Sequence, residues 1–128
     1  MFSHVMIGSN DIPRSKKFYD ALFAAIGGKP GSQDAKGRLT YAHNGGVLMV
    51  TQPIDGSPAT HANGGTYGFA MTGPDQANAW HKAGVASGGT AVEDPPGIRQ
   101  GGGGQLYLAY LRDPDGNKLC ALHRVAAS

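Results

Sequence analysis

The most reactive side chain of this 128-residue sequence belongs to its single cysteine, Cys120. One cysteine cannot form a disulfide within the chain, and CxxC spacings of the kind that hold structural zinc are absent. A thiolate activated by a neighbouring imidazolium would be a nucleophile. Free cysteine more often packs as a small apolar side chain, and packing is the role that we expect for Cys120.

A second candidate for chemistry is Arg99, which precedes a run of four glycines, residues 101–104, and two tyrosines, Tyr107 and Tyr110. A glycine-rich loop of this kind can close over a binding site, where Arg99 would meet a carboxylate or phosphate. The alternative is a flexible, solvated connection. The glycines do not form a phosphate-binding loop, because no Lys-Ser/Thr pair or helix follows them.

Four of the five histidines share no spacing that suggests a joint site, and we interpret them as surface, rim or structural residues. His123 lies on a predicted strand at a position of opposite parity to Cys120, so the two side chains are expected on opposite faces. The residues in question are His43, His61, His81 and His123.

The elements that must position these residues follow from apolar periodicity. Residues 2–8 alternate as a strand does, and a helix is predicted after Asn10-Asp11, with an apolar stripe of Phe18, Leu22 and Ile26. Glycines 27 and 28 are expected to end it. Two apolar runs, residues 39–42 and 47–51, flank an Asn-Gly pair and predict a hairpin.

The same order of elements recurs after residues 53–65, a stretch of turn-forming residues that we interpret as a linker. Residues 66–72 predict a strand, and a helix is expected from Pro74 to about Gly84. Residues 105–111 and 118–124 predict a hairpin joined by the turn Asp113-Pro-Asp-Gly116. An internal duplication is the simplest explanation of this repeat.

The segments His4-Val-Met-Ile-Gly-Ser-Asn-Asp11 and Tyr110-Leu-Arg-Asp-Pro-Asp-Gly-Asn-Lys-Leu-Cys120 resemble the vicinal oxygen chelate superfamily of glyoxalases, bleomycin-resistance proteins and extradiol dioxygenases. The resemblance implies an α+β fold of two βαβββ modules, residues 1–52 and 66–128, joined by the linker 53–65. It further implies mixed sheets that curl around a cup, with the helices outside and the chain assembled as a homodimer. The active site of such proteins lies inside the cup.

Transferred by resemblance, the four metal-ligand positions of the superfamily fall on His4, Met49, Phe69 and Cys120. Phe69 has no donor atom and Met49 offers only a weak thioether, so a divalent ion would lack the ligands it needs. We therefore expect no metal cofactor, with His4 and Cys120 as weak candidates for an alternative divalent metal site. The residues expected to line the cup are His4, Met6, Met49, Phe69, Met71, Arg99, Tyr107 and Cys120.

Composition limits the class of function. The net charge is +2, and the 11 basic residues are scattered, which argues against nucleic acid or an anionic membrane as partner. No apolar run is long enough to span a membrane and no signal peptide is recognisable, so a cytoplasmic location is expected. The expected function is metal-independent binding of a small molecule of undetermined identity. The alternatives are a metal-dependent lyase or dioxygenase rebuilt around His4 and Cys120, and a structural or regulatory domain with a vestigial cup.

Overall fold

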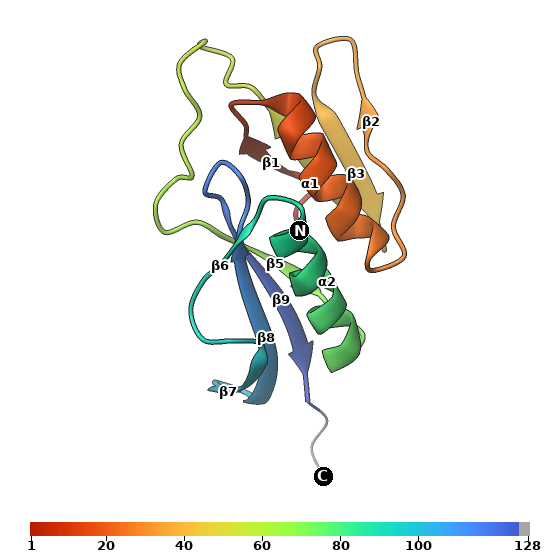
Figure 1. Cartoon of the computed structure of the whole chain (residues 1–128), viewed down its shortest axis with the longest axis vertical. Coiled ribbons are helices and arrows are strands. Elements are labelled where there is room, and N and C mark those ends of the chain that lie inside the picture. The colour runs from red at the N-terminus through yellow and green to blue at the C-terminus, as the bar shows by residue number, and fades with distance from the viewer. Residues whose placement is uncertain (126–128) are drawn as a thin grey trace.

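The computed structural model describes residues 1–125, and its N-terminal module is a four-stranded sheet with one helix (Figure 1). The strand order is β1-β4-β3-β2, with β1 parallel to β4 and the other pairs antiparallel. The elements are β1 (Val5–Gly8), α1 (Ile12–Ala24), β2 (Ser32–Gln33), β3 (Leu39–His43) and β4 (Gly46–Thr51).

The C-terminal module repeats this plan and adds one strand. Its sheet has the order β5-β9-β8-β6, with β7 also paired to β8, and β5 runs parallel to β9 as β1 does to β4. The elements are β5 (Thr66–Ala70), α2 (Pro74–Ala86), β6 (Thr90–Ala91), β7 (Gly97–Gly101), β8 (Gly104–Arg112) and β9 (Lys118–Arg124).

Local sequence explains where α1 begins and which face it buries. The carboxylate of Asp11 accepts a hydrogen bond from the backbone N–H of Arg14, which satisfies one of the free N–H groups of the first turn. The apolar stripe places Phe18, Tyr19 and Leu22 in the interior with no exposed surface. The chain leaves the helix through Gly27, whose φ of 83° favours glycine.

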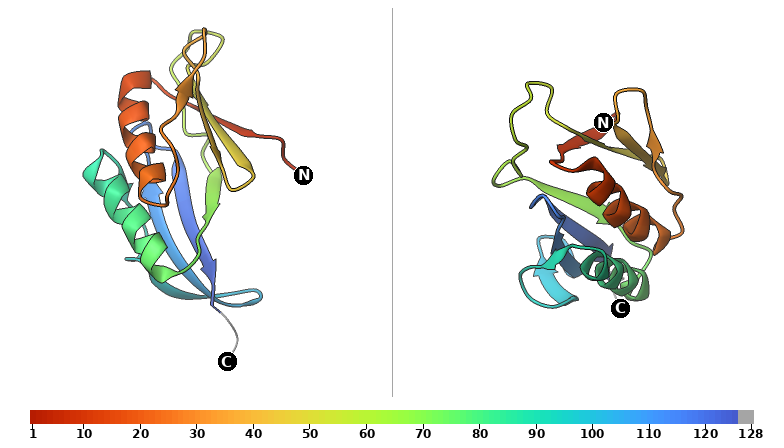
Figure 2. Two further views of the ribbon diagram at one scale, coloured as in Figure 1. Left: turned by 90° about the vertical axis from the view of Figure 1, so that its right-hand side faces the viewer. Right: turned by 45° about the horizontal axis from the view of Figure 1, so that its top comes forward.

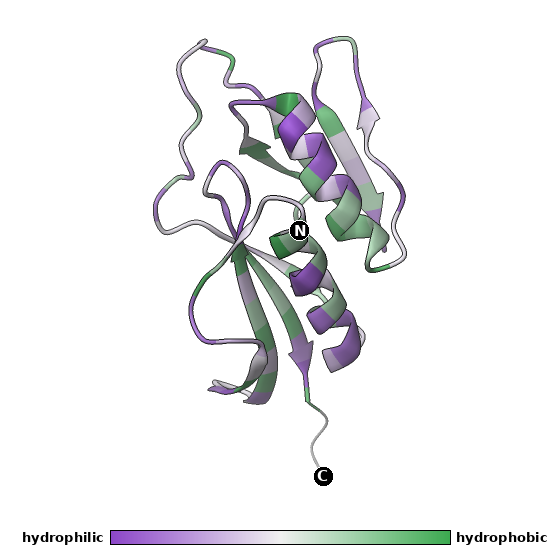
Figure 3. Cartoon of the chain, viewed as in Figure 1, coloured by the Kyte–Doolittle hydropathy of each residue, from purple (hydrophilic) through white to green (hydrophobic). Residues whose placement is uncertain are grey.

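The two helices lie side by side on one side of the molecule, and the strands lie on the other (Figure 2). Trp80 of α2 is fully buried, as are Leu111 of β8 and Leu119 of β9, so the core sits between the helices and the sheets. Hydrophobic segments run along β8 and β9, whereas hydrophilic and hydrophobic segments alternate along both helices (Figure 3). Within residues 1–125, neither helix is long and apolar enough to cross a membrane.

The predicted α+β fold of two modules is confirmed, and the structure adds detail in three places. The short strands β2 and β6 complete the βαβββ order implied by the resemblance, although two-residue strands carry no periodic signal in the sequence. The segment around Arg99 forms β7, and the four glycines make the tight turn of a β7–β8 hairpin, in which Gly101 pairs with Gly104. The stretch 53–65 contains no helix or strand, yet Asn10 fixes its backbone with two hydrogen bonds to Ala59.

Candidate functional site

Each sheet has one face packed on the helices and one face that no helix covers, which we call the helix-free face. In the N-terminal sheet, Ile7, Leu48 and Val50 belong to the core, so the residues that alternate with them lie on the helix-free face. Met6 and Met49 are direct cross-strand neighbours there, and Met6 is 40% exposed. No charged residue of β1, β3 or β4 lies on this face, whose other members are Gly8, Thr40, Ala42, Val47 and Thr51.

The helix-free face of the C-terminal sheet is chemically different. Leu111, Leu119 and Ala121 face the core, so Tyr110 and Cys120, which are cross-strand partners, face the other way. Strand β5 contributes Gly68 beside Cys120. Basic side chains occupy both ends of this face, and its further members are Thr66, Ala70, Arg99, Leu106, Leu108, Arg112, Lys118, Leu122 and Arg124.

Three residues predicted to line the cup lie on the helix side instead. The Phe69 ring centroid is 5.6 Å from that of Trp80, and Met71 is 7% exposed within the same core. The hydroxyl of Tyr107 donates to the side-chain oxygen of Asn78 on α2 at 2.7 Å. An error of one residue in strand register places a side chain on the opposite face of a sheet. Gly68, not Phe69, is the β5 residue beside Cys120.

The other predicted site residues fall on or near the helix-free faces. Met6, Met49 and Cys120 lie on them by register, and Arg99 joins them beside Leu106. His4 precedes β1 and is exposed, with its Nδ1 hydrogen bonded to the hydroxyl of Ser3 at 2.8 Å.

Cys120 is 6% exposed, although it lies outside the main core. Burial raises the pKa of its thiol, opposed by a hydrogen bond with Tyr110. Above this pair, the ammonium of Lys118 lies 4.9 Å from the Tyr110 ring centroid and forms an ion pair with Glu93. Cys120 is therefore a protonated, packed thiol at neutral pH, which agrees with the packing role expected from the sequence.

The remaining histidines are spread over the molecule. His123 faces the helix side, opposite to Cys120 as predicted, with its Nδ1 3.3 Å from the carbonyl oxygen of Met71. His43 packs edge-on against Phe23, and burial lowers the pKa of His81. His61 lies next to Gly116.

A buried polar network joins the two modules. The hydroxyl of Tyr19 on α1 donates to Asp113 at 2.6 Å, and the Asp113 carboxylate also accepts hydrogen bonds from the backbone N–H of Asp115 and of Asn117. Burial, followed by the charge of Asp113, raises the pKa of Tyr19 well above its usual value, so the phenol remains a donor. Arg14 completes the junction by pairing with Asp115 at 2.7 Å. The sequence predicted the turn at residues 113–116 but not the hydrogen bond by which Asp113 holds Tyr19 of α1.

The donor set on the helix-free faces does not fit a divalent metal. Among residues 1–125, no group of three or more His, Cys, Asp or Glu side chains is placed to hold an ion. The positions assigned to metal ligands by resemblance offer the His4 imidazole, the Met49 thioether and the Cys120 thiol, and Phe69 offers no donor. A hard cation, which needs oxygen or nitrogen ligands, would find a single nitrogen donor among these side chains.

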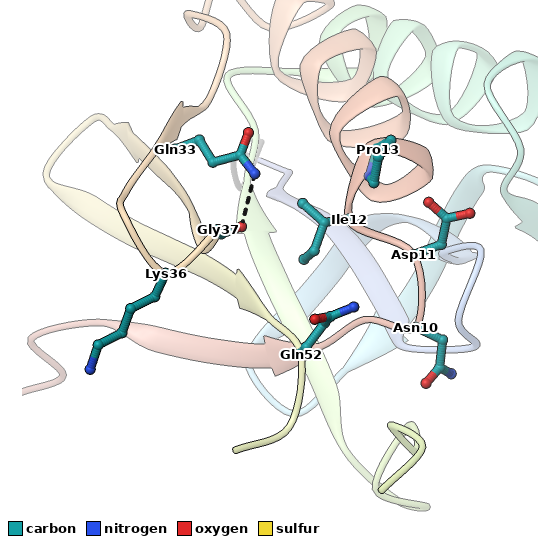
Figure 4. Close-up of a pocket in the computed structure, with 8 residues that line it drawn as sticks. All are labelled: Asn10, Asp11, Ile12, Pro13, Gln33, Lys36, Gly37 and Gln52. Carbon is teal, nitrogen blue, oxygen red and sulfur yellow. Dashed lines mark hydrogen bonds between the residues drawn. The ribbon is translucent and has the colours of Figure 1, made fainter. Parts of the chain in front are cut away.

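Two hollows in the described part of the chain lie around the segment that leads into α1. One of about 420 Å³ opens at the N-terminal end of α1 and is shown in Figure 4. In it the Gln33 amide donates to the carbonyl oxygen of Gly37 at 3.2 Å. A second hollow, of about 280 Å³, shares Asn10 and Gln52 with the first. The walls of the first are Asn10, Asp11, Ile12, Pro13, Gln33, Lys36, Gly37 and Gln52.

Comparison with solved structures shows what this architecture is similar to. A glyoxalase/bleomycin resistance protein from Albidiferax ferrireducens T118 is 58% identical, with a TM-score of 0.93 over 97% of this chain and 99% of that one. A glyoxalase-related enzyme from Fulvimarina pelagi has a TM-score of 0.72 at 19% identity, covering 97% and 88% of the two chains. A glyoxalase/bleomycin resistance protein/dioxygenase family enzyme from Burkholderia phytofirmans PsJN has a TM-score of 0.69 at 15% identity, covering 94% and 95%. The last two show the fold alone.

No curated protein matches the chain. A family model does match, over residues 1–121, which include the N-terminal module, the C-terminal module as far as the middle of β9, and Cys120. The chain therefore belongs to the glyoxalase/bleomycin resistance protein/dioxygenase superfamily.

Proposed function

We propose that this protein binds a small organic molecule without a metal ion, in a cup lined by the helix-free faces of the two sheets. The observation that carries the proposal is the chemistry of the four positions assigned to metal ligands by resemblance, where Phe69 has no donor atom and Met49 offers only a thioether beside His4 and Cys120. Methionine is flexible and polarisable, and it suits adaptable contacts with apolar or flat ligands.

We also propose that the cup is completed by a second copy of the chain. Strands β1 and β5 each have one hydrogen-bonded partner within the described residues, so one edge of each is available to another sheet. Phe2 and Met6 are large apolar side chains next to the β1 edge, with 76% and 40% of their surface exposed. A homodimer would cover them and bring the helix-free face of one module toward that of its partner.

The dimer is tested by light scattering coupled to size-exclusion chromatography. We expect twice the chain mass for the unmodified protein. Met6→Lys should shift the mass toward one chain, because it places a charge in the proposed contact. A monomer at micromolar concentration, without a change in the Met6→Lys variant, would contradict the proposed assembly.

Ligand binding is tested with N-phenyl-1-naphthylamine, an uncharged fluorescent probe, on protein treated with a chelator. We expect saturable binding that added nickel, zinc, iron or manganese does not change. Met49→Asp should weaken it about tenfold or more, because a carboxylate would be buried against the probe. Val85→Asp is the matched control, since it places the same charge on an exposed position of α2.

Two outcomes would overturn the proposed function. Absence of probe binding, or equal binding by the Met49→Asp and Val85→Asp variants, would remove the evidence for the cup. About one tightly held ion per chain, lost in His4→Ala and in Cys120→Ala, would instead favour the lyase or dioxygenase alternative. Metal content by mass spectrometry and a rise in melting temperature with the ion would both be required, because a ligand of the folded state stabilises it.

A further inference from the structure

The basic side chains on the helix-free face of the C-terminal sheet lie in two groups, one at each end. Arg112 and Lys118 are cross-strand partners at the end near the turn that joins β8 to β9. Arg99 and Arg124 lie at the opposite end, near the β7–β8 turn, where each is a cross-strand neighbour of Leu106.

The group near the β8–β9 turn already contacts a carboxylate and a backbone carbonyl. Lys118 forms an ion pair with Glu93, which reaches it from the β6–β7 connection with a left-handed φ of 57°. Arg112 donates from Nη1 to the carbonyl oxygen of Gly116 at 2.6 Å. The feature that separates this end from the other is the Glu93 carboxylate, which neutralises Lys118 and would repel an added anion.

The group near the β7–β8 turn has no such counter-charge. No carboxylate of residues 1–125 lies within ion-pair distance of Arg99 or Arg124. Nη2 of Arg99 donates to the carbonyl oxygens of Asp94 and Pro95, both at 2.9 Å, which fixes the guanidinium while leaving its net charge. Gly97 leaves room for this arrangement, because a Cβ there would come within 3.3 Å of Nη1.

The surface between the two groups is apolar. Leu108 is buried outside the main core and pairs with Leu122, and the next pair along the strands is Tyr110 with Cys120. Burial raises the pKa of Tyr110, and the positive charge of Arg99 opposes that increase. Arg99 lies on β7 and Arg124 on β9, and both strands pair with β8. The backbones of β7 and β9 are therefore about 10 Å apart.

From this arrangement we propose that the ligand of the cup is an amphipathic organic anion. Its carboxylate, sulfonate or similar group lies between Arg99 and Arg124, and its apolar body lies along Leu106 and Leu122, which are partly exposed on this face. The proposal rests on the proposed small-molecule binding function and specifies the class of ligand. Guanidinium groups suit this role because their planar donors bind oxyanions in paired hydrogen bonds.

The test compares two fluorescent probes of nearly the same shape, one anionic and one uncharged. 8-Anilinonaphthalene-1-sulfonate carries a sulfonate that N-phenyl-1-naphthylamine lacks. We expect the unmodified protein to bind the sulfonate at least about tenfold more tightly, the difference expected for a hydrogen bond to a charged group. Added salt should reduce this preference, because part of it is electrostatic.

Variants then locate the anion site. Arg99→Met and Arg124→Met should each weaken sulfonate binding about tenfold while leaving the uncharged probe unchanged. Arg99→Lys keeps the charge without the planar donors, so it should lose less sulfonate binding than Arg99→Met. Arg38→Met is the charge-matched control, because Arg38 pairs with Asp34 in a turn of the other module.

The outcomes separate this proposal from the proposed function. Equal binding of both probes, or an equal loss of sulfonate binding in the Arg99→Met and Arg38→Met variants, would overturn the anion site and leave the cup. Failure of both probes to bind would overturn the proposed function together with the anion site.

Discussion

The junction between α1 and the C-terminal module contrasts with the helix-free faces of the sheets. At the junction, Tyr19 and Asp113 are buried and hydrogen bonded to each other, and Leu22 packs near Gly84 of α2. On the helix-free faces, Met6 is exposed and Gly68 has open space around it. Buried hydrogen bonds and close packing thus characterise the junction, whereas the helix-free faces include an exposed apolar side chain and an unfilled position.

Two turns with the same hydrogen-bond pattern illustrate this contrast. Asp34 and Asp113 each accept hydrogen bonds from the backbone N–H groups two and four residues later. A glycine with positive φ lies three positions after each aspartate, at Gly37 and Gly116. The Asp34 turn is exposed, whereas Asp113 is 4% exposed and also binds Tyr19. Tertiary contact alone makes one of these similar turns an inter-module clamp.

The largest predicted effect follows from breaking this clamp. Asp113→Ala removes a buried acceptor, leaves the Tyr19 hydroxyl without its partner and removes one of the two acceptors of the Asn117 amide. We expect the free energy of unfolding to fall by about 3 kcal/mol. Denaturant unfolding followed by circular dichroism measures the change. Asp34→Ala is the matched control, and an equal loss in both variants would show that the turn matters and the clamp does not.

A smaller effect is expected from adding one methyl group on either side of the sheet. A Cβ at Gly84 would lie 2.3 Å from a buried methyl of Leu111, whereas a Cβ at Gly68 would have no neighbour within 4 Å. Overpacking costs about 1–3 kcal/mol, partly offset by the better helix propensity of alanine, about 1 kcal/mol. Gly84→Ala should therefore lower the melting temperature and Gly68→Ala should not. Equal behaviour of the two variants would remove the distinction between the packed and the open face.

The reactivity of Cys120 tests how closed the helix-free face is around this residue. Because burial raises its pKa above the usual 9.0, the thiol stays protonated at neutral pH. We expect iodoacetamide to alkylate it several-fold more slowly at pH 7 than the same cysteine in the unfolded chain. The rate should still be rising above pH 9.0. Alkylation at pH 7 as fast as in urea would contradict a protonated, packed thiol.

The smallest effect is expected within the N-terminal module, at Asp20. Burial raises the pKa of this carboxyl. Hydrogen bonds from the Gly31 N–H, Lys16 and Tyr41 lower it by more, so the net pKa lies below 3.8. A depressed folded-state pKa stabilises the protein above the unfolded value, and this stability is lost as pH falls through the folded value. Asp20→Asn should therefore flatten the loss of stability below pH 3.8, measured by urea unfolding. An equal loss of stability below pH 3.8 in the variant and the unmodified protein would contradict a lowered pKa of Asp20.

Part of the fold was predictable because its signals are local. The stripe of Phe18, Leu22 and Ile26 predicted α1, and the Asn-Gly pair at 44–45 predicted the β3–β4 hairpin. The strand β7 was missed because its five residues include two glycines and only one large apolar side chain. The helix-side position of Phe69, Met71 and Tyr107 was missed because parity fixes a face only when the register is known.

The sequence by itself determined the duplicated order of elements, the family and the poor supply of metal ligands at Met49 and Cys120, because periodicity, turn residues and side-chain chemistry are properties of the chain. Tertiary structure decided which side chains share a face and which are paired. It set Arg99 beside Leu106 and, from the other strand, Arg124, and it buried Asp113 against Tyr19. These relations join residues far apart in sequence, and they depend on register and packing, which no local pattern encodes.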